Sequence, residues 1–259
     1  MRVGADRSQS MAQVRSWVAA TTKLVVLTGA GISTDSGIPD YRGPKGTWTL
    51  NPQAERTATL SHYLADPEVR RQAWQNRLAS PAWGAQPNDG HRALVDLERR
   101  GRLSVLITQN IDELHQKAGS APERVLELHG TMHHAVCWSC GDRRRMTEIL
   151  DRVRAGEPDP ACESCGGILK SATISFGQDL DAGVLAAAHS AAMSAEVFMA
   201  VGTSLGVFPA ARLVPVAEKA GARLVIVNDQ PTPFDSMAHA IFRQPIGEVL
   251  PQVARSVQI

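Results

Sequence analysis

Short apolar runs of strand length, separated by helical patterns, constrain the fold of this chain more than any other feature. The main runs occupy residues 23–27, 103–108, 197–201 and 224–227. Runs this apolar are typical of strands buried on both faces, as in a parallel sheet that helices cover. Helical patterns lie at residues 12–20, 91–100 and 210–220. The alternation predicts an α/β fold built on an open parallel sheet.

Polar or glycine-containing turns follow each of the main runs. They are Gly29-Ala30-Gly31, Gln109-Asn110, Gly202-Thr203-Ser204 and Asn228-Asp229. Open α/β sheets bind their ligands beyond the carboxyl ends of the strands. We therefore expect these turns to converge on one crevice.

Two segments interrupt the alternation. Residues 44–88 carry five prolines spread through amphipathic pieces, which predicts a small helical insertion. Residues 131–171 contain all four cysteines and little periodic apolar pattern, so this insertion should need a metal or a crosslink to fold. The remaining segments, 12–43, 89–130 and 172–259, are expected to form the main domain.

The cysteines form two Cys-x-x-Cys pairs, Cys137 with Cys140 and Cys162 with Cys165, and 21 residues separate the pairs. Two such pairs can supply four thiolates, at about 2.3 Å, to a tetrahedral Zn²⁺. All four ligands would come from the protein, which leaves no position for a catalytic water, so the metal should be structural. A redox dithiol is the minor alternative. Direct nucleic-acid binding is not expected, because five arginines and six acidic residues between Cys137 and Cys165 leave no basic face.

The overall composition narrows the compartment and the partners. A net charge of +1 gives no general reason to expect a nucleic-acid or membrane partner. No apolar stretch approaches the length of about eighteen residues that would span a bilayer. The first residues lack the apolar run of a secretion signal, which predicts a cytoplasmic protein. Whether Met1 or Met11 is the working start stays open.

The glycine-rich loop after the first run extends from Gly29 to Arg42. Its glycines allow a tight turn and a close approach of backbone N–H groups to a phosphate, and a following helix would add partial positive charge. Four residues, 33–36, fill the span before the third glycine, so the spacing is not that of the dehydrogenase fingerprint. Taken alone, this Gly-x-Gly would fit an ordinary strand-to-helix turn nearly as well.

The loop resembles the signature loop of the sirtuins, and further motifs of that family follow in the same order. They are Gly46-Thr47-Trp48, Thr108-Gln109-Asn110-Ile111-Asp112, Leu114-His115, His129-Gly130, the cysteine pairs, Phe176-Gly177, Gly202-Thr203-Ser204-Leu205 with Val207 and Pro209, and Val227-Asn228. The resemblance implies a Rossmann-like NAD-binding domain and a smaller domain made of the helical and zinc-binding insertions. It also implies NAD⁺-dependent removal of acyl groups from lysines of partner proteins.

His129 follows a short apolar run, and an isolated histidine there would be interpreted as a structural residue. The resemblance makes it the general base, which takes a proton from a ribose hydroxyl after the acyl oxygen has displaced nicotinamide. The products would be nicotinamide, deacylated lysine and 2′-O-acyl-ADP-ribose. Base catalysis of this kind typically contributes about 10²–10⁴-fold in rate.

The resemblance also implies the residues that contact NAD⁺. These are Gly29, Ala30, Gly31, Ile32, Ser33, Asp40, Tyr41, Arg42, Trp48, Gln109, Asn110, Ile111, Asp112, Gly202, Thr203, Ser204, Asn228, Asp229 and Ile246. Tyr41 stands where the family usually has phenylalanine. Ile246 is expected to meet adenine through its backbone.

The acyl preference has one sequence indication. Family members that act on succinyl or malonyl lysine have a Tyr-x-x-Arg pair, and Trp74-x-x-Arg77 falls near that place. Arg77 could bind a carboxylate bidentately. The alternative is a helix with Trp74 in the core and Arg77 in water. Deacetylation is the main hypothesis, and removal of acidic acyl groups is the weaker one.

Two other functions stay open at this point. A mono-ADP-ribosyltransferase would share the cleavage of nicotinamide from NAD⁺. A non-catalytic NAD or ADP-ribose sensor would need no base at the position of His129, which disfavours it.

Overall fold

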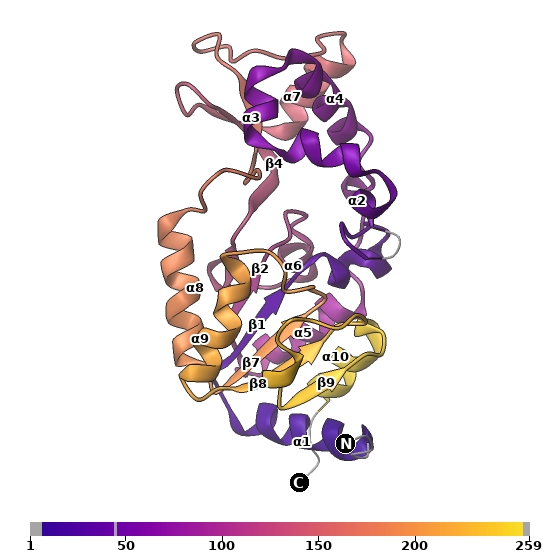
Figure 1. Ribbon diagram of the computed structural model, residues 1–259, viewed down its shortest axis with the longest axis vertical. Coiled ribbons are helices and arrows are strands. Elements are labelled where there is room, and N and C mark those ends of the chain that lie inside the picture. Colours follow the sequence, from indigo (N-terminus) through magenta and orange to yellow (C-terminus); the bar gives the residue numbers. More distant parts are fainter. Residues whose placement is uncertain (1–6, 44–45, 256–259) are drawn as a thin grey trace.

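The computed structural model describes residues 7–43 and 46–255, and six strands of this part form one parallel sheet (Figure 1). Its strand order is β3-β2-β1-β7-β8-β9. The strands are β1 (Leu24–Thr28), β2 (Leu103–Thr108), β3 (Val125–Glu127), β7 (Val197–Val201), β8 (Arg223–Val227) and β9 (Ala240–Phe242). If the six strands are numbered in chain order, this is the doubly wound order 3-2-1-4-5-6. The sequence of strand addition changes sides between β1 and β7, which makes this the switch point of the sheet. The predicted α/β fold is confirmed.

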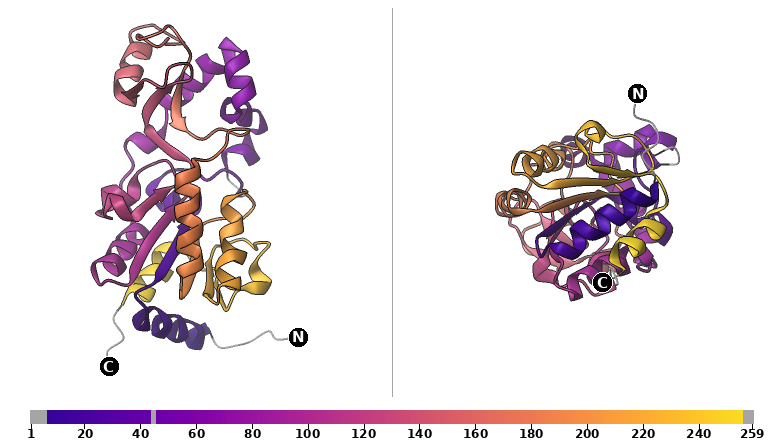
Figure 2. Two further views of the ribbon diagram at one scale, coloured as in Figure 1. Left: turned by 90° about the vertical axis from the view of Figure 1, so that its left-hand side faces the viewer. Right: turned by 90° about the horizontal axis from the view of Figure 1, so that it is seen from below.

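Helices cover both faces of this sheet, so the domain has three layers (Figure 2). On one face pack α1 (Arg7–Ala20), α5 (Asp89–Arg99) and α10 (Ile246–Ala254). On the other pack α8 (Ala182–Ser194) and α9 (Leu213–Lys219). Strand β1 is buried along its whole length. Its Val26 packs in the core beneath α1, α5 and α10, and its Val25 and Leu27 pack in the core beneath α8 and α9. Burial on both faces explains why the strand reads as a continuous apolar run.

Several boundaries differ from the sequence prediction. The helix predicted for 12–20 begins at Arg7. The pattern at 210–220 forms a 3₁₀ turn, η5 (Ala210–Arg212), before α9. Strand β9 and helix α10 were not predicted. The chain keeps α10 helical although Pro251 lies inside it.

A second, antiparallel sheet in the order β5-β4-β6 lies beyond the carboxyl end of the main sheet (Figure 1). Its strands are β4 (Gly130–Cys137), β5 (Arg143–Arg145) and β6 (Leu169–Thr173). The nearby helical elements are α2 (Thr47–Leu50), η2 (Pro52–Ala58), α3 (Leu60–Ala65), α4 (Pro67–Leu78), η3 (Pro81–Trp83) and α7 (Met146–Arg154). The segment predicted as a helical insertion forms short helices and 3₁₀ turns joined by irregular residues, and its Pro44 and Lys45 lie outside the described residues.

The two inserted segments share one apolar core. Met146, Ile149, Leu150 and Val153 of α7 are buried at the spacing of one helix face, and Trp74 of α4 packs among them. The expectation that residues 131–171 hold little periodic apolar pattern was therefore wrong. The apolar periodicity covers only the nine residues of α7, and the loops and cysteines on either side carry none.

In the part of the chain that the structure describes, no helix has the length and apolar character needed to cross a membrane.

Candidate active site

The turns predicted to converge do lie together, at the carboxyl ends of the central strands. Gly31 N donates to Gly202 O over 2.8 Å, which joins the loop after β1 to the loop after β7. The Gln109 side chain, at the end of β2, donates from Nε2 to Thr203 Oγ1 over 2.9 Å. The parallel register brings these strand ends to one edge of the sheet, so residues far apart in sequence meet there.

The glycines at this edge are needed because the two loops touch. A Cβ atom on Gly29 or Gly31 would lie 2.8 Å from the backbone of Gly202, and Gly202 itself has a φ of +60°. The N–H groups of Gly29 and Gly31 donate to Val201 O and Gly202 O. These two N–H groups already have acceptors within the protein, so a phosphate would have to meet other N–H groups of the loop. The expected helix is also only a 3₁₀ turn, η1 (Ala30–Ser36).

A buried polar network links the first loop to the loop after β2. Ser33 Oγ donates to Asp112 Oδ2 over 2.7 Å, and Asn110 Nδ2 donates to Ser33 Oγ over 3.2 Å. All three side chains are buried. Burial raises the pKa of Asp112, while hydrogen bonds from Leu114 N and Ser33 oppose that shift. The network fixes where the Asn110 and Asp112 side chains point.

His129 stands between β3 and β4 and is half-buried. Its Nδ1 lies 2.9 Å from Gln109 O. A carbonyl oxygen can only accept, so Nδ1 carries the hydrogen and Nε2 is the basic nitrogen. No residue of the described ranges hydrogen-bonds Nε2. Burial, and secondarily the charge of Arg42, lower the pKa of His129 below its ordinary value. The ring is therefore neutral and able to accept a proton near neutral pH.

Three aromatic rings and the guanidinium of Arg42, whose charge acts on His129, form one stack. The Trp48 ring lies 4.5 Å from Tyr41 and 5.2 Å from Phe176, between ring centroids. Arg42 Cζ lies 4.6 Å from the centroid of Trp48. The sequence marks Phe176 only as part of the Phe176-Gly177 motif. Its role in the stack depends on the β6 segment returning to η2, where Phe176 N donates to Ala58 O.

The remaining predicted cofactor residues lie around the same edge. Asp40 Oδ1 accepts from Gly43 N and so closes the turn after Pro39. Ser204 and Asp229 are exposed, and Asn228 is buried with its Nδ2 donating to Gln230 O. Ile246 begins α10, and its side chain flanks Gly90 together with that of Ile32. Ile111 is half-buried in the loop after β2.

The four cysteines meet next to the second sheet, where Cys137 ends β4 and the other three lie outside the strands. Their Sγ atoms all lie within 4.8 Å of one another, with Cys137 and Cys165 at 3.5 Å and Cys140 and Cys162 at 3.8 Å. A disulfide needs about 2.05 Å, so these are not disulfides. A tetrahedron with Zn–S bonds of about 2.3 Å has edges of about 3.8 Å, so the spacing fits Zn²⁺. The cluster has no place for a fifth, catalytic ligand from solvent without losing a thiolate.

Trp74 and Arg77 take positions that match neither sequence interpretation fully. Trp74 is completely buried, as the alternative proposed. Arg77 is not in water but half-buried, with Cζ 5.2 Å from the Trp74 ring and 5.7 Å from the Tyr63 ring. Within the described ranges, no carboxylate pairs with its guanidinium. The guanidinium of Arg77 therefore lies against the rings of Trp74 on α4 and Tyr63 on α3.

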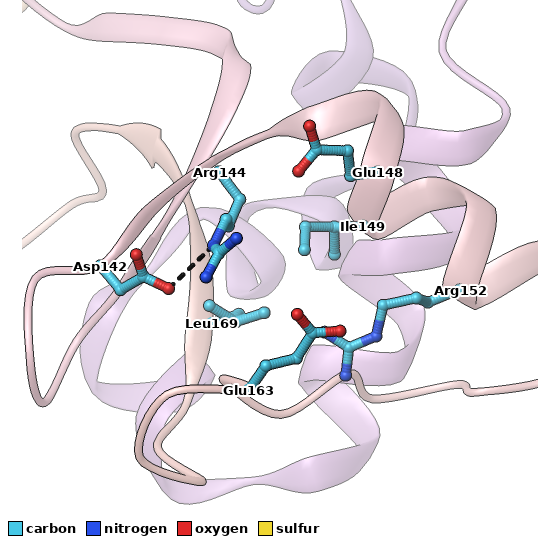
Figure 3. A pocket seen from close by; sticks show the side chains of 7 residues that line it. All are labelled: Asp142, Arg144, Glu148, Ile149, Arg152, Glu163 and Leu169. Carbon is cyan, nitrogen blue, oxygen red and sulfur yellow. Dashed lines mark hydrogen bonds and ion pairs between the residues drawn. The ribbon is translucent and has the colours of Figure 1, made fainter.

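The pocket in Figure 3 belongs to the second sheet and α7 and contains none of the predicted site residues. Its lining residues are Asp142, Arg144, Glu148, Ile149, Arg152, Glu163 and Leu169. Both arginines are already paired, Arg144 with Asp142 at 2.9 Å and Arg152 with Glu157 at 2.7 Å. The cluster of loops at the carboxyl ends of the strands therefore remains the candidate active site.

The fold and this site together define a Rossmann-like protein with a cluster of hydrogen-bonded loops at the sheet's switch point and a four-cysteine module. The family model described as "Sir2 family" matches residues 29–209. The chain belongs to the Sir2 family. The family recognised from the sequence motifs is thereby confirmed.

Relatives and solved structures are similar over nearly the whole chain. An "NAD-dependent protein deacetylase 2" of Streptomyces coelicolor is 52% identical over 234 residues, which is 90% of this chain and 97% of the relative. An "NAD-dependent protein deacetylase 1" of Pyrobaculum aerophilum is 43% identical, over 93% of this chain and 92% of the relative. A solved "Sir2-p53 peptide-NAD+" complex has a TM-score of 0.85 and 32% identity, covering 94% of this chain and 96% of that one.

Proposed function

We propose that this protein is an NAD⁺-dependent protein lysine deacylase that removes acetyl groups and releases nicotinamide and 2′-O-acyl-ADP-ribose. The observation that carries the proposal is the position of His129. Its Nδ1–H donates to Gln109 O, in the loop after β2, and its Nε2 has no hydrogen-bond partner among the described residues. The deacetylase names of the relatives support the same reaction.

His129 acts as the general base. NAD⁺, when bound, supplies the ribose carbon from which nicotinamide leaves. The Gln109 carbonyl keeps the ring in the tautomer that can take a proton at Nε2, and burial keeps the ring neutral. Because the proton is accepted only once a ribose hydroxyl is in reach, the base contributes to the chemical step more than to NAD⁺ binding.

The cofactor residues fall into two groups in this proposal. Ser33, Asn110 and Asp112 hold the nicotinamide half, because their network is buried and its donors and acceptors are fixed. Arg42 and Trp48 enclose that half from the side of Phe176. The loops at Gly202 and Asn228 meet the phosphates and the adenosine ribose. Residues 12–43, 89–130 and 172–259 would form the NAD-binding domain, with α1 extending it to Arg7.

Zn²⁺ would be bound by the four thiolates as a structural ion. Cys137 and Cys162 are buried in the core that α7 shares with Trp74, so the metal would hold β4 and the loop at 162–165 against that core. Because every ligand is a thiolate, we assign no reaction step to the metal.

The acyl preference depends on Arg77. Its guanidinium is half-buried and lacks a carboxylate partner in the described chain, so it could pair with an acidic acyl tail. Acetyl lysine stays the main substrate, and succinyl or malonyl lysine is the weaker one. Arg77→Met should lower the ratio of desuccinylation to deacetylation, whereas Arg71→Met on the same helix should not. An unchanged ratio in Arg77→Met would remove Arg77 from substrate recognition.

The second candidate, mono-ADP-ribosyl transfer, shares only the first step and is not favoured by the relatives. Incubation with NAD⁺ and peptides that carry acetyl or succinyl lysine separates the two. Deacylation predicts nicotinamide release that depends on the acylated peptide, with loss of the acyl mass from that peptide. Nicotinamide release that labels protein with ADP-ribose and leaves the acyl group in place would contradict the proposal. The cytoplasmic location stays a prediction.

A further inference from the structure

Two histidines that the proposed mechanism does not use lie in contact beneath the active-site edge. His91 belongs to α5 and His115 to α6 (Leu114–Ala118), and both are at most 1% exposed. Their ring centroids are 4.9 Å apart and the rings are tilted by 55°. Burial lowers the pKa of His91 to about 4 and that of His115 well below its ordinary value. Arg92 adds to the shift of His91. Both rings are therefore neutral near pH 7, and each has one donor and one acceptor nitrogen.

The protein fixes the hydrogen position on His91. Asn88 N lies 3.3 Å from His91 Nδ1, in the capping box that begins α5. A backbone N–H can only donate, so Nδ1 accepts and the ring hydrogen lies on Nε2. This Nε2 is buried and has no partner among the residues that the structure describes. A buried donor without an acceptor is costly, so it should be satisfied in the folded protein.

His115 can supply the missing acceptor. Its Nε2 lies 2.9 Å from Thr28 Oγ1, and its buried Nδ1 also has no partner within residues 7–43 and 46–255. Thr28 Oγ1 donates to Thr108 Oγ1 over 2.8 Å. If the His115 hydrogen is on Nε2, Nδ1 is an acceptor and complements the His91 donor. If it is on Nδ1, both of the buried ring nitrogens that lack a partner are donors.

We propose that His91 and His115 are positioning residues that complete a hydrogen-bonded chain from Asn88 to Asn110, with the hydrogen on Nε2 of both rings. Because neither nitrogen reaches a partner among the described residues, the two rings are joined through one shared water molecule. At one end, Asn88 Nδ2 donates to Ile32 O and Ser36 Oγ over 2.8 and 2.9 Å.

At the other end of this chain, Asn110 N donates to Thr108 Oγ1 over 3.0 Å, and the Asn110 side chain reaches Ser33. This series of hydrogen bonds therefore connects the loop after β1 to the loop after β2. Its effect on catalysis rests on the proposed function, in which Asn110 and Ser33 hold the nicotinamide half of NAD⁺. The hydrogen positions do not depend on that function.

The first test reads the histidine tautomers in the full-length wild-type protein by ¹⁵N NMR of the imidazole rings. At pH 7 we expect neutral rings with the hydrogen on Nε2 for His91 and His115. His129 should show the opposite tautomer, with the hydrogen on Nδ1, and serves as an internal reference. A hydrogen on Nδ1 of His115, or a charged ring at either buried position, would overturn the proposal.

The second test compares steady-state kinetics of three variants. His115→Leu removes both nitrogens and should raise the KM for NAD⁺ about ten-fold, with a smaller change in the KM for peptide. His115→Gln keeps an amide donor toward Thr28 and should recover part of this loss. His189→Leu, an exposed position on α8, is the matched control and should match the wild type. A folded His115→Leu with a wild-type KM for NAD⁺ would refute the positioning role. If this variant does not fold, the tautomers of the wild type decide.

Discussion

Gly202 is the position where the structure predicts the sharpest link between backbone contact and cofactor binding. It has a φ of +60°, and a Cβ added there would lie 2.4 Å from Ile32 N and 2.7 Å from the carbonyl carbon of Gly31. Both neighbours are backbone atoms of the loop after β1, so no side-chain rotation can make room. Gly202→Ala should therefore move the two loops apart.

The free-energy cost of Gly202→Ala has two parts. One is the backbone strain of any alanine with a positive φ, and the other is the clash specific to this position. A left-handed alanine costs about 1–2 kcal/mol at any position. The clash adds more, because ordinary contacts between heavy atoms lie near about 3.5 Å and the loops must separate by about 1 Å. This displacement stretches the bond from Gly31 N to Gly202 O, which contributes about 1 kcal/mol. A misplacement of about 1 Å can reduce the rate about 10²-fold.

Gly101→Ala is the matched control. Gly101 has a φ of +66° in the turn between α5 and β2, and a Cβ there would meet nothing within 4 Å. It should lower the melting temperature by about 2–4 °C per kcal/mol of strain and leave the KM for NAD⁺ unchanged. Gly202→Ala should melt lower than Gly101→Ala and show a KM for NAD⁺ raised by about 10-fold or more.

The two measurements are thermal unfolding and steady-state kinetics with NAD⁺ as the varied substrate. Equal melting temperatures and equal KM values for the two variants would refute the reasoning, because the loop contact would then carry no energetic or functional weight.

Three further predictions concern protons and the metal. Because burial lowers the pKa of His129, kcat/KM should stay constant above pH 7 and fall only on the acid side, with a midpoint below the ordinary histidine value of about 6.5. A midpoint above 7 would contradict the neutral-base assignment. Cys140→Ser or a strong chelator should release one Zn²⁺ per chain and unfold the second sheet, since such sites contribute about 10–16 kcal/mol, whereas Ser164→Ala should keep the metal. Metal analysis and circular dichroism distinguish these outcomes. Burial lowers the pKa of Lys170 to about 7, while an unfolded lysine keeps its proton to about 10.4. The unfolded chain then holds more protons between these values, so the free energy of unfolding should rise with pH there, and Lys170→Met should flatten that rise.

The sheet was predictable because its physical signal is local. Strands such as β2 and β7 are buried on both faces, so their apolar runs begin and end where the strands do. The same reason explains why the sequence does not predict β9, which has three residues and an exposed Ile241. Helix α10 was not predicted, because Pro251 lies within it and proline usually ends or kinks a helix.

The site was predictable in part. The convergence of Gly31, Gln109 and Gly202 follows from strand ends meeting at one edge, and the four cysteines follow from ligand spacing. What the sequence could not supply is which partner each group has. Gly31 N could be expected to face a phosphate, but it donates to Gly202 O, because only the folded register brings the two loops together. The contact of His91 with His115 joins two helices that no local pattern relates.

The most direct test of the central claim is a stoichiometric product measurement on the wild type and on His129→Ala. With NAD⁺ and an acetyl-lysine peptide, the wild type should release nicotinamide, deacetylated peptide and O-acetyl-ADP-ribose in equal amounts. His129→Ala should still bind NAD⁺ and lose deacetylation by about 10²-fold or more. Nicotinamide released without any acetyl-ADP-ribose, or a His129→Ala enzyme as active as the wild type, would contradict the assignment of this site as a deacetylase with His129 as its base.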